Sequence, residues 1–275
     1  MRQIGLIAGS GEISLLLGRE IVREGREPVV IDLTEGPKKV WEGISRKIFH
    51  LEVGQVGKII DLLHREEISK IVMAGKVPKA LLFKGLELDK KARNILVNLK
   101  ERSDEAIMLG IIAELEKEGI KVAKQRDYLR HLFPEQGLLT ETAPDELQSL
   151  DIEYGMRLAR EIAKLNIGQM VVVKNQTVLA VEAIEGTDET ILRGGKLGGQ
   201  DVVVAKVSKP DQDPRFDIPT VGLSTIETMR KVKAKVLSIE AGKVFLVNKE
   251  EVIQRANEYG IVIFCKKVFD KPKRL

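Results

Sequence analysis

One stretch decides how the fold is read: Ile4-Gly5-Leu6-Ile7-Ala8-Gly9-Ser10-Gly11. The apolar run at 4–8 predicts a buried strand, and the glycines that follow predict a tight turn. Apolar residues then recur at helical spacing over 13–23, so a helix follows the turn. A strand, a glycine turn and a helix in this order are typical of a parallel sheet that is covered by helices.

The same alternation continues through the first half of the chain. Strands are expected at 28–33 and 70–75, and helices at 56–64 and 104–117. This predicts an α/β, Rossmann-like parallel-sheet domain over residues 1–133. The polar stretch after it is rich in Thr, Pro and Asp, and we interpret residues 134–150 as a linker.

In the second half strands and helices no longer alternate regularly, and short strands with mixed connections are expected instead. A hairpin is expected around Lys174–Thr177, although its Asn is not followed by Gly. Residues 151–275 are therefore predicted to form a mixed α+β catalytic domain. The expected helices are 151–164 and 250–259, and the expected strands are 169–173, 178–182, 202–207, 234–239, 244–247 and 261–265.

Composition narrows the class of protein. The 275 residues carry a net charge of +4 with 31% charged residues, which is a mixed surface and no case for binding nucleic acid. The single cysteine, Cys265, lies in an apolar run and is expected to be a buried thiol. With neither a bilayer-length apolar segment nor a secretory signal in view, the expected location is the cytoplasm. A homo-oligomer is compatible with this composition.

The first candidate site is the glycine turn together with Lys76. Glycines let a backbone approach a phosphate, and ligands of open α/β sheets bind beyond the carboxyl ends of the strands. Lys76 follows the strand at 70–75, so we expect it on the same rim as Gly9 and Gly11. A tight turn that needs small residues and a solvated loop lysine remain the plain alternatives.

The second candidate is Glu182-Ala183-Ile184-Glu185-Gly186-Thr187-Asp188. Its carboxylates could hold a divalent cation through oxygen ligands. Its Gly-Thr-Asp run could instead start and cap a helix. The residues alone leave both open.

The third candidate is the loop Lys206-Val207-Ser208-Lys209-Pro210-Asp211-Gln212-Asp213-Pro214-Arg215-Phe216-Asp217-Ile218-Pro219. Prolines restrict the backbone, so the charged side chains are presented with limited freedom. Cations that neutralise phosphate oxygens, beside Asp residues that bind Mg²⁺ or position water, suit metal-assisted phosphoryl chemistry. We favour an active site here over a plain polar loop.

These segments, in this order and over essentially the whole chain, resemble the LpxI-type UDP-2,3-diacylglucosamine pyrophosphatases. Asn166-Ile167-Gly168-Gln169 and the continuation of the loop to Gly222 add to the resemblance. Two places differ from the family pattern: Ile13-Ser14 stands where Leu-Pro is frequent, and Ser103-Asp104-Glu105 where Gly-Asp-Asp is frequent.

The resemblance implies a hydrolase of lipid metabolism that acts in lipid A biosynthesis and requires Mg²⁺ or Mn²⁺. It would split UDP-2,3-diacylglucosamine into UMP and 2,3-diacylglucosamine 1-phosphate, with transient contact at the inner-membrane surface. Asp217 or Asp213 would supply the essential acid, with Asp217 preferred; the metal candidates are Asp213, Asp217 and Glu185. The residues expected to bind the substrate are Gly9, Ser10, Gly11, Lys76, Thr187, Lys206, Lys209, Gln212 and Arg215.

Two other functions compete with this one. An NAD(P)-dependent oxidoreductase would use Gly9, Gly11 and Asp32 as its dinucleotide fingerprint, but Ser14 occupies the third glycine position. A non-catalytic nucleotide- or lipid-binding protein would hold the same ligand without turning it over.

Overall fold

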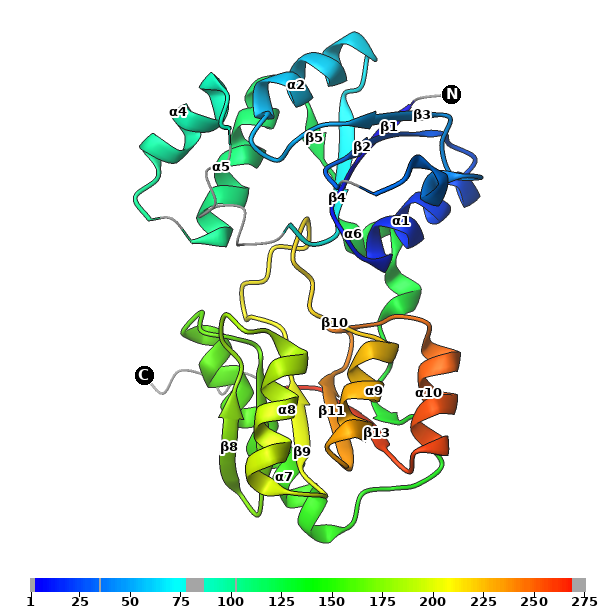
Figure 1. Ribbon diagram of the computed structural model, residues 1–275, viewed down its shortest axis with the longest axis vertical. Helices are drawn as coiled ribbons and strands as arrows, with labels where there is room; N and C mark the ends of the chain where they lie inside the picture. Colours follow the sequence, from blue (N-terminus) through cyan, green and yellow to red (C-terminus); the bar gives the residue numbers. More distant parts are fainter. Residues whose placement is uncertain (1–2, 35, 78–86, 102, 269–275) are drawn as a thin grey trace. The chain divides into compact units, whose positions relative to one another are not determined.

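The computed structural model describes residues 3–34, 36–77, 87–101 and 103–268. The chain divides into two compact units (Figure 1). Unit 1 comprises Met1–Arg130 and the short segment Asp213–Asp217, while unit 2 comprises His131–Gln212 and Ile218–Leu275. The chain therefore leaves unit 2 after Gln212, contributes five residues to unit 1, and returns at Ile218.

Unit 1 is built on a five-stranded sheet with the order β3-β2-β1-β4-β5, in which every neighbouring pair is parallel. In this order β1 is the central strand, so the glycine turn at residues 9–11 lies at the end of the central strand. The strands are β1 (Ile4–Ala8), β2 (Pro28–Asp32), β3 (Lys47–His50), β4 (Lys70–Ala74) and β5 (Lys121–Val122).

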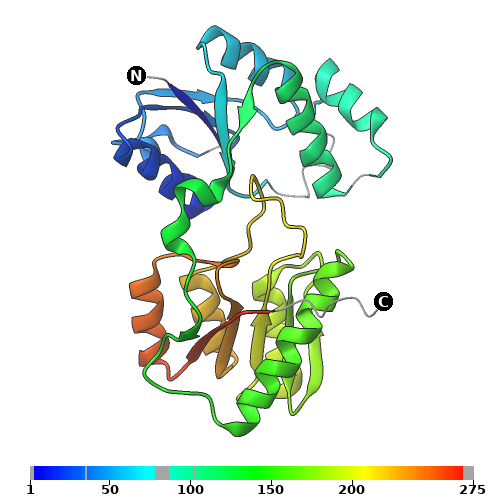
Figure 2. The same ribbon diagram turned by 180° about the vertical axis from the view of Figure 1, so that it is seen from behind.

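Helices cover both faces of this sheet (Figures 1 and 2). Alternate residues of β1 point to opposite faces, as the pleat requires: Leu6 packs beneath α1 near Gly18, whereas Ile7 joins the apolar cluster under α2, α4 and α5. The helices are α1 (Glu12–Arg23), η1 (Lys38–Trp41), α2 (Val56–Arg65), α4 (Lys90–Asn98), α5 (Asp104–Lys117) and α6 (Gln125–Tyr128), and η2 (Arg130–Leu132) follows them.

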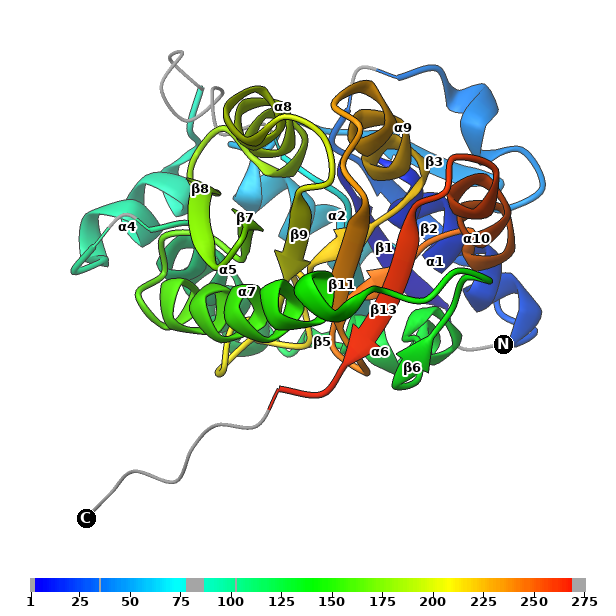
Figure 3. The ribbon, with the colours of Figure 1, turned by 90° about the horizontal axis from the view of Figure 1, so that it is seen from below.

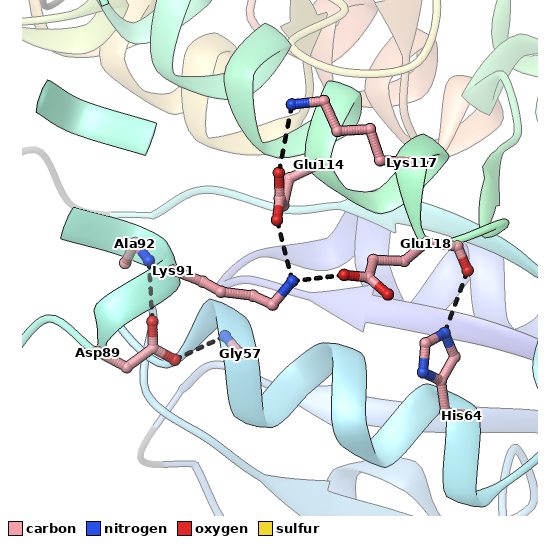
Figure 4. A network of polar contacts seen from close by, with 8 residues as sticks. All are labelled: Gly57, His64, Asp89, Lys91, Ala92, Glu114, Lys117 and Glu118. Carbon is pink, nitrogen blue, oxygen red and sulfur yellow. Dashed lines mark hydrogen bonds and ion pairs between the residues drawn. The ribbon is translucent and has the colours of Figure 1, made fainter. Parts of the chain in front are cut away.

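A polar network ties α2, α4 and α5 together at the edge of this cluster (Figure 4). Lys91 Nζ on α4 donates to Glu114 at 2.9 Å and to Glu118 at 2.5 Å, and hydrogen bonds from this lysine lower the pKa of Glu114. Asp89 caps α4 through Ala92 N and also accepts the Gly57 N–H of α2. The network fixes the helices that enclose the apolar cluster.

Unit 2 contains a six-stranded mixed sheet with the order β6-β13-β11-β9-β7-β8. Its central strands β13, β11 and β9 are parallel, whereas β7, β8 and β6 run antiparallel to their neighbours. Strands β10 and β12 form a separate two-stranded parallel sheet. The strands are β6 (Gly137–Leu138), β7 (Met170–Lys174), β8 (Thr177–Val181), β9 (Val203–Lys206), β10 (Thr220–Val221), β11 (Val236–Glu240), β12 (Phe245–Leu246) and β13 (Val262–Lys266).

One long helix covers one face of this sheet and three helices cover the other (Figure 3). Val171 and Val173 of β7 pack with α7, while Met170 and Val172 belong to the opposite cluster, which includes residues of α8, α9 and α10. Because both faces are buried, the strands read as continuous apolar runs. The helices are α7 (Glu146–Lys164), α8 (Thr187–Gly198), α9 (Leu223–Lys231) and α10 (Lys249–Glu258).

The α/β class, with a Rossmann-like parallel sheet followed by a mixed α+β part, is confirmed. Helix α7 begins earlier than the expected residue 151, because Asp145 and Gln148 form a capping box. Part of the stretch interpreted as a linker is also ordered secondary structure, since β6 pairs with β13. Cys265 is buried as expected, and burial raises the pKa of its thiol to about 12.

The expected hairpin also forms, and a buried carboxylate explains how it does so without glycine. Asn175 and Gln176 adopt positive φ angles of 50° and 54°. The Asp151 carboxylate of α7 accepts both of their backbone N–H groups, at 2.9 and 2.6 Å. These two bonds stabilise a turn conformation that non-glycine residues rarely adopt.

Replacing Phe216 tests the five-residue contribution to unit 1. Phe216 is 6% exposed within the apolar cluster of unit 1. Phe216→Ala should lower the free energy of unfolding of unit 1 by about 3–5 kcal/mol through lost burial and the cavity left behind. The single tryptophan, Trp41, is buried in unit 1, so its fluorescence during urea unfolding reports that unit.

The matched control is Val97→Ala on α4, because Val97 is 78% exposed and should change little. Equal urea midpoints for the two variants would show that unit 1 does not depend on Phe216.

Candidate functional site

The glycine turn after β1 is packed tightly against the segment after β4. Ser10 and Lys76 exchange backbone hydrogen bonds of 2.9 and 2.7 Å, so these two predicted site residues do lie together. A Cβ on Gly9 would lie 2.6 Å from the carbonyl oxygen of Lys76. Gly9 is thus required by the approach of two backbone segments. Pro78, two residues after Lys76, lies outside the described residues.

Gly11 has a different reason to be glycine. Its φ of 103° and ψ of 167° fall in a region that is essentially restricted to glycine. A Cβ there would meet nothing within 4 Å, and no side chain caps α1 at this end. Ser14, which replaces the third fingerprint glycine, donates its hydroxyl to Gly9 O at 2.9 Å and is buried. Gly11 therefore presents the start of α1, while Gly9 and Ser14 hold the turn together.

Asp32, the ribose acid of the competing dinucleotide interpretation, has a structural role. Its Oδ1 accepts bonds from the backbone and hydroxyl of Thr34, and its Oδ2 accepts the indole N–H of Trp41 at 2.8 Å. The side chain is 1% exposed. These contacts account for the carboxylate at the end of β2 without a nucleotide.

The segment that unit 1 receives from the loop is organised by an ion pair. Arg215 contacts Asp213 in a bidentate arrangement, with its shortest distance 2.7 Å, and also donates to Glu116 of α5 at 3.1 Å. Burial tends to raise the pKa of Asp213, but the hydrogen bonds and charge of Arg215 outweigh it and hold the pKa below its ordinary value. Asp213 is therefore an ionised, paired carboxylate.

Two further contacts fix this segment within unit 1. Pro214 O accepts the backbone N–H of Gln125 at 2.9 Å, and the Gln125 side chain donates to Met73 O at the end of β4. Phe216 is buried in the apolar cluster. Asp217, the next residue, is exposed and has a φ of 54°, an uncommon conformation that Asp tolerates better than most residues.

The start of the same loop is anchored in unit 2 by a buried ionic cluster that the sequence analysis missed. Ser208 N donates to Glu240 Oε2 at 2.9 Å, and Ser208 O accepts from Arg160 at 2.8 Å. Arg160 lies 3.5 Å from Glu240, and Lys243 lies 2.9 Å from its other oxygen. Both Arg160 and Glu240 are less than 5% exposed. The available signal was Glu240, an acid that ends the largely apolar strand β11.

Unit 2 also brings together Lys206 and Thr187. Lys206 ends β9 and is 6% exposed, and its ammonium donates to Thr187 Oγ1 at 2.5 Å. Thr187 begins α8, whose N-cap is Gly186 with a φ of 82° and without a side-chain cap. A helix start was one of the two interpretations left open for this segment, and the helix forms, but neither Thr187 nor Asp188 caps it. A buried ammonium beside an uncapped helix start is suited to an anion.

Lys209 and Gln212 occupy the part of the loop that belongs to unit 2. The backbone N–H of Gln212 donates a hydrogen bond to Lys209 O at 3.4 Å. Within the described chain, Gln212 Oε1 and Gln169 Oε1 are buried without a hydrogen-bond partner. Buried acceptors without partners are uncommon and mark places where a ligand or water can supply the donor.

The proposed metal ligands are divided between the two units. Asp213 and Asp217 belong to unit 1 and Glu185 to unit 2. Glu185 Oε1 accepts from Arg193 at 2.6 Å, and its own backbone N–H together with Arg193 lowers its pKa. Across residues 3–34, 36–77, 87–101 and 103–268, no three His, Cys, Asp or Glu side chains gather as a metal site.

The ion pair of Asp213 generates a pH prediction. A carboxyl whose pKa is lowered by folding stabilises the folded state above its unfolded pKa and loses that contribution as pH falls through the folded value. Wild type should exceed Asp213→Asn in unit 1 stability at neutral pH. The difference should disappear below the ordinary value of 3.8, as pH approaches the lowered pKa. Urea unfolding followed through Trp41 at several pH values measures it.

Asp211→Asn, an exposed change of the same charge, should show no such acid-dependent difference. A stability gap for Asp213→Asn that persists unchanged at low pH would contradict the ion-pair explanation.

Comparison with solved structures finds distant likenesses. A precorrin-6A reductase, CobK, matches with a TM-score of 0.34 and 14% identity, covering 100% of this chain and 91% of the other. The Thermus thermophilus UDP-glucose 4-epimerase in complex with NAD matches with a TM-score of 0.34 and 12% identity, covering 97% and 86%. Likenesses of this size do not bear on function.

The sequence comparisons are more specific. The family model of the LpxI N-terminal domain matches residues 3–132, and that of the LpxI C-terminal domain matches residues 135–264. A relative from Caulobacter vibrioides, the UDP-2,3-diacylglucosamine pyrophosphatase LpxI, is 30% identical over 274 residues, covering 96% of this chain and 97% of the relative. Both halves of the chain and the order in which they occur agree, and the chain belongs to the LpxI family.

Proposed function

We propose that this protein hydrolyses the pyrophosphate bond of UDP-2,3-diacylglucosamine, releasing UMP and 2,3-diacylglucosamine 1-phosphate for lipid A biosynthesis. The observation that carries the proposal is the buried Lys206 ammonium at the uncapped start of α8. The name of the Caulobacter relative, which matches over nearly its full length, supports the choice of substrate.

The chemistry asks for cations near the phosphates and a group that handles the attacking water. Water adds to a phosphorus atom, the bond to the bridging oxygen breaks, and the departing phosphate carries the charge. Lys206 and Lys209 are proposed to neutralise phosphate oxygens, because charge stabilisation is the main catalytic need in this reaction class. Gly11 is proposed to admit a phosphate to the start of α1.

Asp217 is the preferred catalytic carboxylate. Asp213 is held in a bidentate pair with Arg215, so its proposed role is to orient that guanidinium. Asp217 is exposed, and the buried Phe216 beside it fixes the backbone from which it extends. A carboxylate presented in this way is suited to accepting a proton from water.

A requirement for Mg²⁺ or Mn²⁺ remains part of the proposal. The lack of a preformed three-carboxylate set among the described residues is compatible with it, because Mg²⁺ is commonly held by one or two carboxylates together with substrate phosphates. When bound, the cation would neutralise charge on the pyrophosphate.

The test is incubation of the purified protein with UDP-2,3-diacylglucosamine and Mg²⁺, followed by mass analysis. We expect UMP and the lipid 1-phosphate, no product in excess EDTA, and recovery on adding metal. Binding without products would favour the non-catalytic alternative. A fluorescence response to NADH without UMP release would favour the oxidoreductase, which the contacts of Asp32 already disfavour.

Asparagine variants separate the loop carboxylates. Asn tolerates the left-handed backbone of Asp217, so Asp217→Asn removes the charge while keeping the conformation. It should fold, bind substrate with KM little changed, and lose at least ~100-fold in kcat. Asp213→Asn should also lose activity, and the exposed Asp211→Asn much less. Near-normal kcat in folded Asp217→Asn would remove it from the mechanism.

We also propose that the protein works in the cytoplasm and touches the inner-membrane surface transiently. No helix in the described part of the chain is long and apolar enough to span a bilayer. Leu165, Ile167 and Ile184 are 68%, 49% and 76% exposed. The end of α7 and the end of β8 lie together, since a Cβ on Gly168 would touch Glu182, and Glu182 N donates to Met170 O.

Charged substitutions test this apolar rim. Ile184→Asp should reduce cosedimentation with phosphatidylglycerol vesicles about 10-fold, from the lost burial of one large aliphatic side chain. Hydrolysis of detergent-solubilised substrate should change little. Leu197→Asp is the control, because Leu197 is equally apolar, 66% exposed, and near the opposite end of α8. Equal loss for both variants would mean that the rim has no special role.

A further inference from the structure

Glu182 lies behind the two proposed phosphate-binding residues of unit 2. Its Oε1 accepts the hydroxyl of Thr187 at 2.7 Å, and Thr187 in turn receives the Lys206 ammonium at 2.5 Å. Its Oε2 accepts the backbone N–H of Gln169 at 3.1 Å. One carboxylate thus reaches the end of β9 through the first residue of α8.

The direction of these hydrogen bonds is fixed by chemistry. An ammonium only donates, an ionised carboxylate only accepts, and a hydroxyl has a single proton to give. The proton of Thr187 must therefore point to Glu182, which leaves a lone pair of the hydroxyl for Lys206. The chain of bonds defines where the ammonium is held.

Burial makes this arrangement consequential. Lys206 is 6% exposed, and a desolvated ammonium is unfavourable unless hydrogen bonds and a nearby negative charge compensate it. Glu185, the neighbouring acid, accepts from Arg193 and Thr190 instead. The described contacts connect Glu182 to Lys206 through Thr187.

We propose that Glu182 is a positioning residue: acting through Thr187, it holds the Lys206 ammonium in place to receive a phosphate oxygen. The inference rests on the proposed function for its substrate, and it assigns Glu182 no direct contact with that substrate. It also gives Glu182, one of the acids of the 182–188 segment, a role other than binding a cation.

An amide cannot replace this carboxylate. Two donors, the Gln169 N–H and the Thr187 hydroxyl, point at its two oxygens. In Glu182→Gln one of these positions becomes an NH₂ group, so one bond is lost in either orientation of the amide. Glu182→Gln is therefore a nearly isosteric variant that removes the negative charge and one of the two hydrogen bonds of the carboxylate.

A double-mutant cycle with Lys206→Met gives the decisive readout. Glu182→Gln should lower kcat/KM at least about 10-fold, as for hydrogen bonds to charged groups. In the Lys206→Met background the same change should have little further effect, because it acts through that ammonium. Thermal melts confirm folding, and Glu189→Gln, an exposed acid in the first turn of α8, is the control. Additive losses would overturn the proposal.

A second measurement is independent of the substrate. Lys206 should react with acetic anhydride slowly in wild type and in Glu189→Gln, and faster in Glu182→Gln, as measured by peptide mass spectrometry. If wild type releases no UMP but Lys206 is acetylated faster in Glu182→Gln than in wild type, the proposed function fails and the positioning role stands. Labelling and turnover that are both indifferent to Glu182 would refute the positioning role.

Discussion

The burial of Phe216 is the contact on which the arrangement of the candidate site depends. The aromatic ring belongs to the apolar cluster of unit 1, although the residues on both sides of its segment, Gln212 and Ile218, belong to unit 2. Hydrophobic burial has no directional preference, so the orientation comes from polar contacts beside it. These are the Pro214 bond to Gln125 and the pairing of Arg215 with Asp213 and Glu116. Together these contacts fix the backbone from which the side chains of Asp213 and Asp217 extend within unit 1.

The other end of the loop is fixed by the opposite kind of interaction. Ser208 is held by the buried charges of Arg160 and Glu240, in a part of unit 2 otherwise filled by aliphatic side chains. Buried ion pairs add little net stability compared with apolar packing, but breaking one leaves an uncompensated charge. Such a pair specifies one arrangement of the backbone. An apolar contact at one end and an ionic contact at the other thus restrain a loop that has few backbone hydrogen bonds of its own.

Much of the fold could be predicted because its signals are local. The apolar runs of β1 and β4 and the period of α5 are read directly from neighbouring residues, and each forms where the pattern indicates. Helix α8 was harder, since Thr187-Asp188 was equally consistent with a turn or a cation site. The contacts that build the site are the least predictable, because the pairs Ser10 with Lys76 and Arg215 with Glu116 join residues far apart in the sequence. Gly9 illustrates the limit: the sequence does not show that the carbonyl oxygen of Lys76 lies where a Cβ of residue 9 would be.

The membership of Asp213–Asp217 in unit 1 has a consequence for how such a protein can be divided or recombined. A gene fragment that ends at Arg130 encodes the whole parallel sheet but omits an aromatic side chain of its core. Such a fragment is therefore expected to be less stable than unit 1 in the full chain. A contiguous fragment that contains all of unit 1 must also contain residues 131–212 of unit 2.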